Sequence, residues 1–205
     1  PCCLRQLCLR QESSWPLRQQ CPPCLLDEGS ASLKVDACIV ERDQTGGLGF
    51  TASDDDSYAA PPCVLASGRT EIVMTDCSVT TADGCFGAGV IVLDHALASV
   101  TRCTISGHSG PSMAVSSSQK TLLSSNTITR GQSNVVVVSG SSTVCLVDNI
   151  ISLHELAAVF LKDSSSAVME RNIIRDNMMS GLCLTALSSS KLSENVFSKN
   201  DRHGV

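Results

Sequence analysis

Aromatic residues, long basic runs and long apolar runs are all scarce in this sequence. Aromatic residues make up 3% of its 205 residues, which leaves few candidates for the exposed rings that line sugar-binding grooves. The formal net charge is −5 and no long basic run occurs, so we expect neither nucleic acid nor a membrane as a partner. No apolar stretch reaches the roughly 18 residues that a membrane-spanning helix needs.

The sequence also lacks Asn-x-Ser/Thr sequons and a recognisable signal peptide, although it contains 12 cysteines. Several cysteines fall at interior positions of a repeat, where a free thiol packs like a small hydrophobic side chain. We therefore expect an intracellular, cytoplasmic location, in a cytoskeletal or another large complex. Because the chain starts at Pro1 and stops within a repeat, we also expect it to be a piece of a longer protein.

What the sequence does contain is a repeat with a period of 23 residues. The regular units begin at Leu97, Lys120, Thr143, Ser166 and Ser189. Two longer units, from Ala31 and from Arg69, carry insertions. Apolar residues alternate within runs of three to five residues that end at Ser, Asn or Gly, which is strand periodicity and leaves no room for helices. Such units must bury their apolar sides against the units above and below, so the repeat predicts stacked parallel coils.

One column of the repeat changes from cysteine to asparagine along the chain. Its members are Cys38, Cys77, Cys103, Asn126, Asn149, Asn172 and Asn195. Identical side-chain amides one coil apart can form a hydrogen-bonded ladder, and asparagine tolerates the left-handed backbone of a sharp corner. We therefore predict a structural ladder at an inside corner, with free thiols at its cysteine end.

The run from Asn195 to Asn200 followed by Gly204, and the run from Asn172 to Asn177 followed by Gly181, resemble the repeat of pectin-lyase-like proteins. That superfamily includes NosD-type and sugar-hydrolase domains and the β-helix region of certain F-box proteins. The resemblance implies an all-β, right-handed parallel β-helix (a solenoid) of about seven coils over residues 31–205. Residues 1–30 then form a Cys-rich N-terminal segment that is placed to cap the first coil. The fold alone does not define a function.

The acidic residues do not form the pair that sugar cleavage requires. Charge gathers in one column of mixed sign, which contains Asp76, Arg102, Ser125, Asp148, Arg171 and Glu194. We expect Asp148, Arg171 and Glu194 to stack and pair at the surface. No column places two carboxylates in neighbouring coils, so the acid and base of a glycosidase are not visible and we assign no catalytic residue.

Two histidines are candidate catalytic groups because they lie in the same loop column of the repeat. His108 follows Gly107, which resembles part of the turn motif of polygalacturonases, but the paired aspartates of that motif are absent. His154-Glu155 resembles part of the alginate epimerase motif, whose preceding Asp-Pro is also absent. We therefore expect both histidines to lie at a solvated corner rather than in an active site.

No metal site or cofactor is assigned. Asp54–Asp56 lie in a long insertion without the spacing of a calcium loop, which favours a solvated acidic loop. The N-terminal cysteines contain one Cys-x-x-Cys pair, which is half of a zinc site. Whether the N-terminal cysteines bind zinc stays open; they are Cys2, Cys3, Cys8, Cys21 and Cys24.

Apolar residues at outward positions are the most informative departure from the repeat. Two sets of three consecutive coils carry them, namely Val137, Phe160 and Cys183, and Ile150, Ile173 and Val196. Contiguous apolar patches usually mark contact surfaces, so these columns are the candidate binding residues.

Three functions remain open at this point. The interpretation that fits best is a non-catalytic structural scaffold that binds other proteins within a larger intracellular assembly. A carbohydrate-active enzyme or a carbohydrate-binding β-helix is the first alternative, and it rests on fold analogy and the two histidines. The substrate-recognition region of a ubiquitin ligase is the second alternative, and it rests on the resemblance to F-box β-helix proteins. The sequence names no partner and no oligomeric state.

Overall fold

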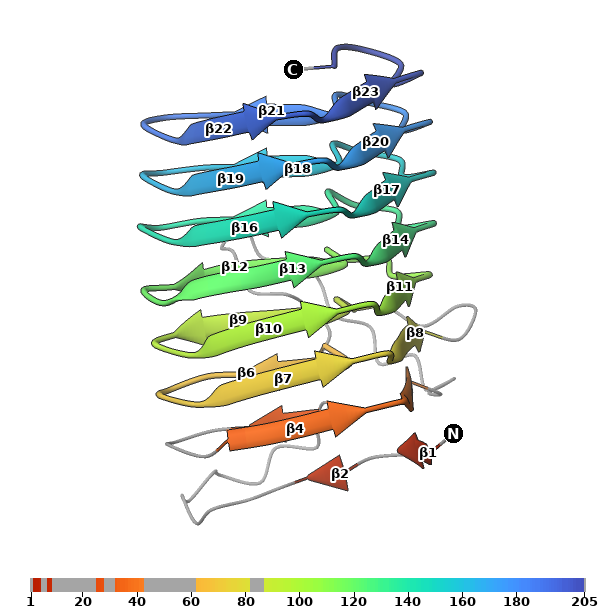
Figure 1. Ribbon diagram of the computed structural model, residues 1–205, viewed down its shortest axis with the longest axis vertical. Coiled ribbons are helices and arrows are strands. Elements are labelled where there is room, and N and C mark those ends of the chain that lie inside the picture. The colour runs from red at the N-terminus through yellow and green to blue at the C-terminus, as the bar shows by residue number, and fades with distance from the viewer. Residues whose placement is uncertain are drawn as a thin grey trace, which may run out of the picture.

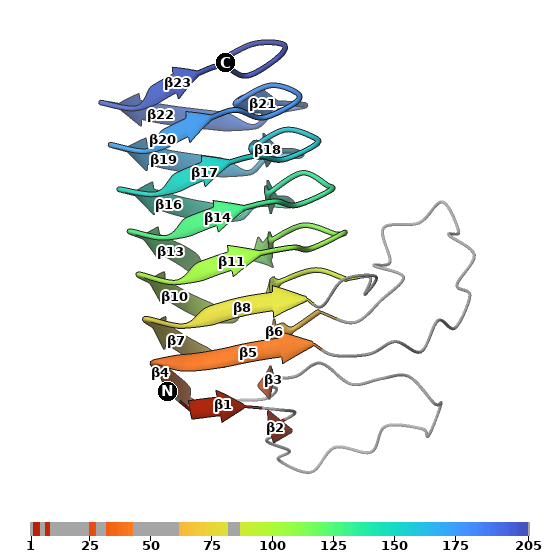
Figure 2. The same cartoon turned by 90° about the vertical axis from the view of Figure 1, so that its right-hand side faces the viewer.

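A computed structural model describes residues 2–4, 7–8, 25–27, 32–42, 62–81 and 87–204. All regular structure within these residues is β-strand, and the strands form three parallel sheets that run along a stack of coils (Figure 1). From residue 32 onward each coil contributes its strands to the three sheets in turn, and a corner separates one sheet from the next (Figure 2). The chain is therefore the all-β solenoid that the repeat predicts.

Three sheets contain all the strands of the described residues, and we number them in the order in which a coil enters them. Sheet 1 has seven strands, β4 (Ser32–Asp36), β7 (Glu71–Thr75), β10 (Leu97–Thr101), β13 (Lys120–Ser124), β16 (Thr143–Val147), β19 (Ser166–Glu170) and β22 (Ser189–Ser193). Sheet 2 has eight, β1 (Cys2–Leu4), β5 (Cys38–Arg42), β8 (Ser78–Thr81), β11 (Thr104–Ser106), β14 (Thr127–Thr129), β17 (Ile150–Ser152), β20 (Ile173–Arg175) and β23 (Val196–Ser198). Sheet 3 has eight, β2 (Leu7–Cys8), β3 (Leu25–Asp27), β6 (Val64–Ala66), β9 (Val90–Asp94), β12 (Met113–Ser117), β15 (Val136–Val138), β18 (Val159–Leu161) and β21 (Leu182–Leu184).

Neighbouring strands pair in the register that the 23-residue period requires. Ile151 of β17, for example, pairs with Ile174 of β20. The period is longer near the N-terminus, where Val35 pairs with Met74, because residues 43–61 are inserted between β5 and β6. Strands β1 to β3 pair within sheets 2 and 3, and the division into a segment 1–30 and repeats 31–205 stays a prediction.

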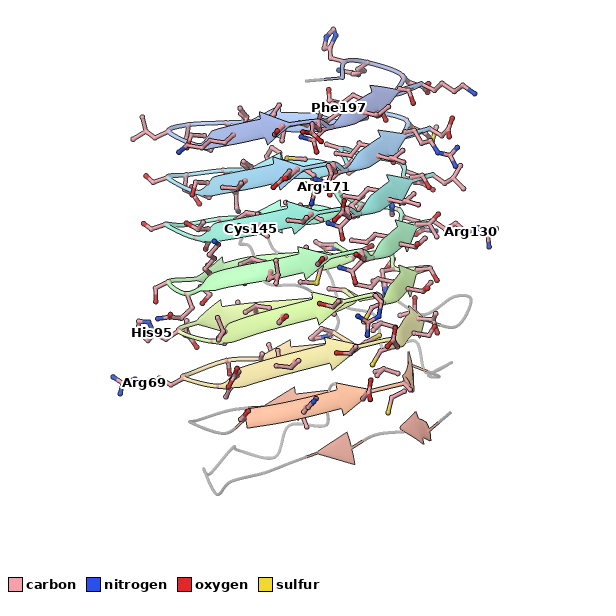
Figure 3. All side chains as sticks on the ribbon, viewed as in Figure 1. Arg69, His95, Arg130, Cys145, Arg171 and Phe197 are labelled. Carbon is pink, nitrogen blue, oxygen red and sulfur yellow. The ribbon has the colours of Figure 1, made fainter. Side chains whose placement is uncertain are left out.

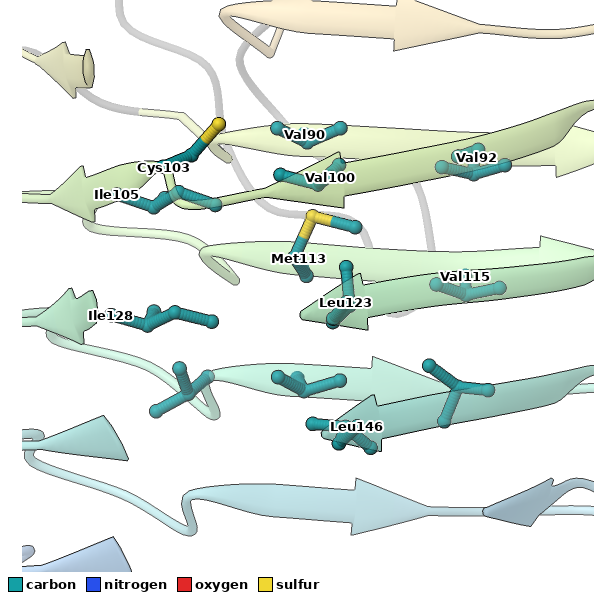
Figure 4. Close-up of a cluster of buried hydrophobic side chains, with 14 of the residues drawn as sticks. Val90, Val92, Val100, Cys103, Ile105, Met113, Val115, Leu123, Ile128 and Leu146 are labelled. Carbon is teal, nitrogen blue, oxygen red and sulfur yellow. The ribbon is translucent and has the colours of Figure 1, made fainter. Parts of the chain in front are cut away.

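The core lies inside the coil and consists of stacked apolar columns (Figure 4). Val100, Leu123 and Leu146 form one such column on sheet 1, and each of these side chains is 0% exposed. Ile105 and Ile128 continue the packing from sheet 2. Burying one side chain of this size contributes roughly 1.5–3 kcal/mol, so the columns supply the main force that stacks the coils.

The corners contain residues with a left-handed backbone, which corrects one expectation. At corner 1, between sheets 1 and 2, the φ angles of these residues lie between 50° and 56°. They are Ala37, Asp76, Arg102, Ser125, Asp148, Arg171 and Glu194. The cysteine and asparagine column was expected to adopt this conformation, but each of its members is the next residue. The left-handed residue turns the chain with its own side chain in solvent, and the following side chain then points into the corner.

Candidate functional site

Corner 1 contains the predicted asparagine ladder. The Oδ1 atom of Asn149 accepts hydrogen bonds from the backbone N–H and from Nδ2 of Asn126, at 2.9 and 3.0 Å. Its Nδ2 atom donates to Oδ1 of Asn172 and to the carbonyl oxygen of Leu123, at 2.9 Å each. The same set of bonds joins Asn172 to Asn195. Asn126, Asn149 and Asn172 are at most 1% exposed, so their amides satisfy backbone groups between the coils that solvent does not reach.

The cysteine end of the ladder makes weaker hydrogen bonds, because sulfur replaces the amide oxygen as the acceptor. The backbone N–H of Cys103 donates to Oδ1 of Asn126 at 2.9 Å, and the N–H of Cys77 donates to Sγ of Cys103 at 3.4 Å. Cys77 and Cys103 are free thiols, as predicted. Burial raises the pKa of Cys103 to about 11, so this thiol stays neutral and serves as a packing group.

Corner 2, between sheets 2 and 3, buries both histidines, so the expectation of a solvated corner is wrong. His154 is 1% exposed. Its Nδ1 accepts a hydrogen bond from the N–H of Gly131 at 2.9 Å, and its Nε2 donates to the carbonyl oxygen of Ile128 at 3.0 Å. His108 is 0% exposed, and its Nε2 lies 3.3 Å from the carbonyl oxygen of Val79. The side chains at this position point into the corner, where they meet backbone groups of the coil below.

Together these residues form a second ladder, which the sequence analysis did not identify. Its column contains His108, Gly131, His154, Asn177 and Asn200, at the same 23-residue spacing. Oδ1 of Asn177 accepts from the N–H of His154 at 3.2 Å, and Oδ1 of Asn200 accepts from Nδ2 of Asn177 at 2.9 Å. The imidazole of His154 thus makes the same two kinds of bond as an amide. The sequence analysis missed this ladder because its members differ chemically, although their 23-residue spacing is regular.

Corner 3, between sheets 3 and 1, is closed by serine hydroxyls. Oγ of Ser165 donates to the carbonyl oxygen of Val138 at 3.1 Å, and Oγ of Ser142 accepts from the N–H of Ser117 at 2.9 Å. All three serines are buried. Each corner therefore uses inward polar side chains to satisfy backbone groups of the neighbouring coil.

The outward charges pair at the surface, with one difference from the prediction. Arg102 binds Asp76 at 2.7 Å, and Arg171 binds Asp148 at 2.8 Å through its Nε atom. Arg171 also contacts its neighbour Glu170, while no ion pair with Glu194 occurs among the described residues. The hydrogen bonds from arginine hold the pKa values of Asp76 and Asp148 below the ordinary range, so both carboxylates are ionised.

No group of three or more His, Cys, Asp or Glu side chains within the described residues is arranged to hold a metal ion. The structure does not describe Asp54–Asp56 or the side chains of the N-terminal cysteines. Zinc binding by these cysteines therefore stays an open question. No helix among the described residues is long and apolar enough to cross a membrane.

The predicted outer columns lie on sheets 2 and 3. Ile150, Ile173 and Val196 pair in sequence on sheet 2 and are 37%, 39% and 52% exposed. The column of Val137, Phe160 and Cys183 lies on the outer face of sheet 3. Its side chains are half-buried.

The sheet 3 column is part of a wider apolar surface. The sheet 3 column continues downward through Ala114, Ile91 and Leu65. Ile91 and Ala114 form a small separate cluster and are only 3% and 4% exposed, although they point away from the coil interior. Ile91 and Leu65 escaped the sequence analysis because the insertions in the first coils obscure the register, whereas Ala114 keeps the 23-residue spacing from Val137.

The outer face of sheet 1 carries a further apolar column, which was also not identified. Leu122 and Val168 are each 38% exposed. Cys145 lies between them in register on β16, and is 7% exposed (Figure 3). Lys34 and Lys191 lie on the same face of sheet 1 and are exposed, so charge flanks the apolar stretch along the stack.

Comparison with known proteins agrees with this geometry. Residues 62–205 match the family described as a right-handed β-helix region. No curated protein and no solved structure gives a match. The stacked parallel sheets, the 23-residue register and this match, which covers more than half of the chain, lead to one conclusion: the chain belongs to the right-handed β-helix family.

Proposed function

We propose that this chain is a non-catalytic scaffold that binds other proteins through the apolar columns on its outer faces. The observation that carries the proposal is the alignment of apolar side chains at outward positions in consecutive coils. Ile150, Ile173 and Val196 on sheet 2 are the most exposed set. An apolar surface that a stable fold leaves open to water usually marks a contact site.

The way the polar side chains are used supports a role without catalysis. In the coils from β11 to β23, most inward amides, imidazoles and hydroxyls are bonded to backbone or to one another. The exceptions are Nδ1 of His108 and the hydroxyls of Ser112 and Thr121, and all three are buried away from solvent. The most strongly perturbed carboxylates are those paired with arginine, and Asp76 and Asp148 remain exposed and ionised. Neither arrangement provides an acid and a base that face a common substrate. An intracellular assembly is the setting we infer for such a scaffold.

The proposal is tested by placing charges in the outer columns. The double variant Phe160→Asp plus Ile173→Asp puts a carboxylate into each column without entering the core. The matched control is Ser116→Asp plus Thr104→Asp, which changes exposed outward positions on the same two sheets, with Thr104 two coils away from Ile150. Affinity capture from cell extract, with equal folding checked by circular dichroism, compares both with the unaltered chain.

We expect proteins that are retained by the unaltered chain and by the control to be lost by the column variant. Retention of the same proteins by all three chains would contradict the role of the columns. Cleavage of uronic-acid polymers that disappears on substitution of His154 would instead favour the carbohydrate-active alternative.

A further inference from the structure

Corner 2 holds its two histidines in a single protonation state. His154 uses Nδ1 as an acceptor for the Gly131 N–H and Nε2 as a donor to the Ile128 carbonyl, so only the neutral Nε2–H tautomer fits. A proton added at Nδ1 would create an N–H group that points at the backbone N–H of Gly131, and two donors repel each other. The backbone of Gly131 packs closely against this ring, since a Cβ atom added to Gly131 would lie 2.8 Å from Nδ1. The ring therefore has little room to move aside.

His108 sits in the same column under similar restrictions. Its Nε2 faces the carbonyl oxygen of Val79, and its Nδ1 is buried without a hydrogen-bond partner. A side chain at Gly89 would lie 2.9 Å from Nε2, so the ring is closely enclosed on that side. An added proton on this ring would have no acceptor.

No charged side chain among the described residues is placed to stabilise an imidazolium, and Asp83 lies outside those residues. Carbonyl and N–H groups from β8, β14 and the coil below face the two rings. Burial lowers the pKa of His108 to about 4, and repulsion from His154 acts in the same direction. Burial also lowers the pKa of His154, although its two backbone hydrogen bonds offset part of the effect.

The other titratable groups near this corner that the structure describes do not compensate for that charge. Arg130 and Glu155 are exposed on the outside of the loops. Asp176 forms an ion pair with its neighbour Arg175. The thiol of Cys63 is directed at the carbonyl oxygen of Thr80.

We propose that the His108–His154 pair makes corner 2 an acid-sensitive latch, which holds the coils together at neutral pH and releases them when the imidazoles take up protons. The latch is independent of the scaffold role. It follows from the replacement of amides by imidazoles in two coils of a ladder that elsewhere uses Asn177 and Asn200.

The direction of the effect follows from proton linkage. The folded histidines bind protons more weakly than the unfolded ones, so the unfolded state takes up more protons below pH about 6.5. Stability is therefore complete above that pH and falls as the pH drops toward the folded values. For His108 alone, the folding equilibrium constant should decrease about 20-fold between pH 7 and pH 5. The carboxylates of Asp76 and Asp148 titrate below this window because their pKa values are lowered.

The test compares urea unfolding of the 205-residue chain at pH 7 and pH 5 with that of His108→Asn plus His154→Asn. Asparagine is the residue that the same column uses in later coils, and it does not titrate in this range. The matched control is His95→Asn, because His95 is exposed at corner 3. We expect the unaltered chain and the control to lose at least about 20-fold more in the folding constant than the double variant.

An equal loss in the double variant and the unaltered chain would overturn the proposal. Should the double variant not fold, histidine resonances of the unaltered chain followed by NMR across the same pH range decide the matter. Folded pKa values of His108 and His154 well below 6 support the latch, and values near 6.5 for both refute it.

Discussion

Replacing Asn149 by alanine removes four side-chain hydrogen bonds from the middle of the corner 1 ladder. The N–H of Asn126 and the carbonyl oxygen of Leu123 each lose the amide that faces them. A buried polar group left without a partner costs about 1–3 kcal/mol, so two such groups predict a loss of about 2–6 kcal/mol. A loss of this size is a large part of the stability of an ordinary domain.

The assay is urea unfolding followed by far-ultraviolet circular dichroism at neutral pH. The matched variant is Asn149→Cys, because the ladder itself places cysteine at Cys77 and Cys103. The Cys103 sulfur accepts an N–H at 3.4 Å, so we expect Asn149→Cys to lose about half as much stability as Asn149→Ala. If Asn149→Ala lies within about 0.5 kcal/mol of the unaltered chain, the reasoning that the ladder stabilises the stack is refuted.

Three further predictions concern the corners and the thiols. Gly181→Ala should destabilise the last coils by about 1–3 kcal/mol, because the added Cβ would lie 2.6 Å from Cδ1 of Phe197; limited proteolysis and thermal unfolding measure this loss. Ala186→Gly should stabilise the chain by about 0.5–1 kcal/mol in urea unfolding, because residue 186 has a φ of 56°. Alkylation of the native chain, mapped by peptide mass spectrometry, should modify half-buried Cys183 much faster than Cys103, which is 1% exposed.

Each of these predictions has an outcome that contradicts it. Gly140→Ala, in the same corner column as Ala186 and with a φ of 67°, should lose stability; a gain there would mean that backbone conformation does not control this corner. Unchanged stability of Gly181→Ala would mean that the coil above can shift without cost. Equal alkylation of Cys103 and Cys183 under native conditions would contradict the buried position of the cysteine column.

The fold could be predicted from the sequence because residues separated by one repeat become neighbours when the coils stack. Residues 23 apart, such as Asn149 and Asn172, become hydrogen-bonded neighbours when the coils lie in register. The alternation of apolar residues then determines which side chains point inward, and Ile151 and Ile174 are both fully buried. The asparagine ladder was predictable because its members are chemically identical.

The remaining features depend on geometry that the spacing does not encode. The second ladder combines imidazole, glycine and amide, and only the three-dimensional corner shows that His154 makes the bonds of an amide. The left-handed residues include Leu153 and Ala186, types with no intrinsic preference for that conformation. The burial of Ile91, which points outward, depends on more than its strand pattern.

The central claim is that the outer apolar columns are contact surfaces, and site-specific photocrosslinking tests it most directly. A photoreactive residue is placed at Val137 or at Ile150, and at Ser116 or Thr104 as matched positions on the same sheets. Crosslinking in cell extract should join both column positions to the same protein, and the matched positions should give weaker crosslinks or none. Column positions that crosslink no more than the matched positions would contradict the account.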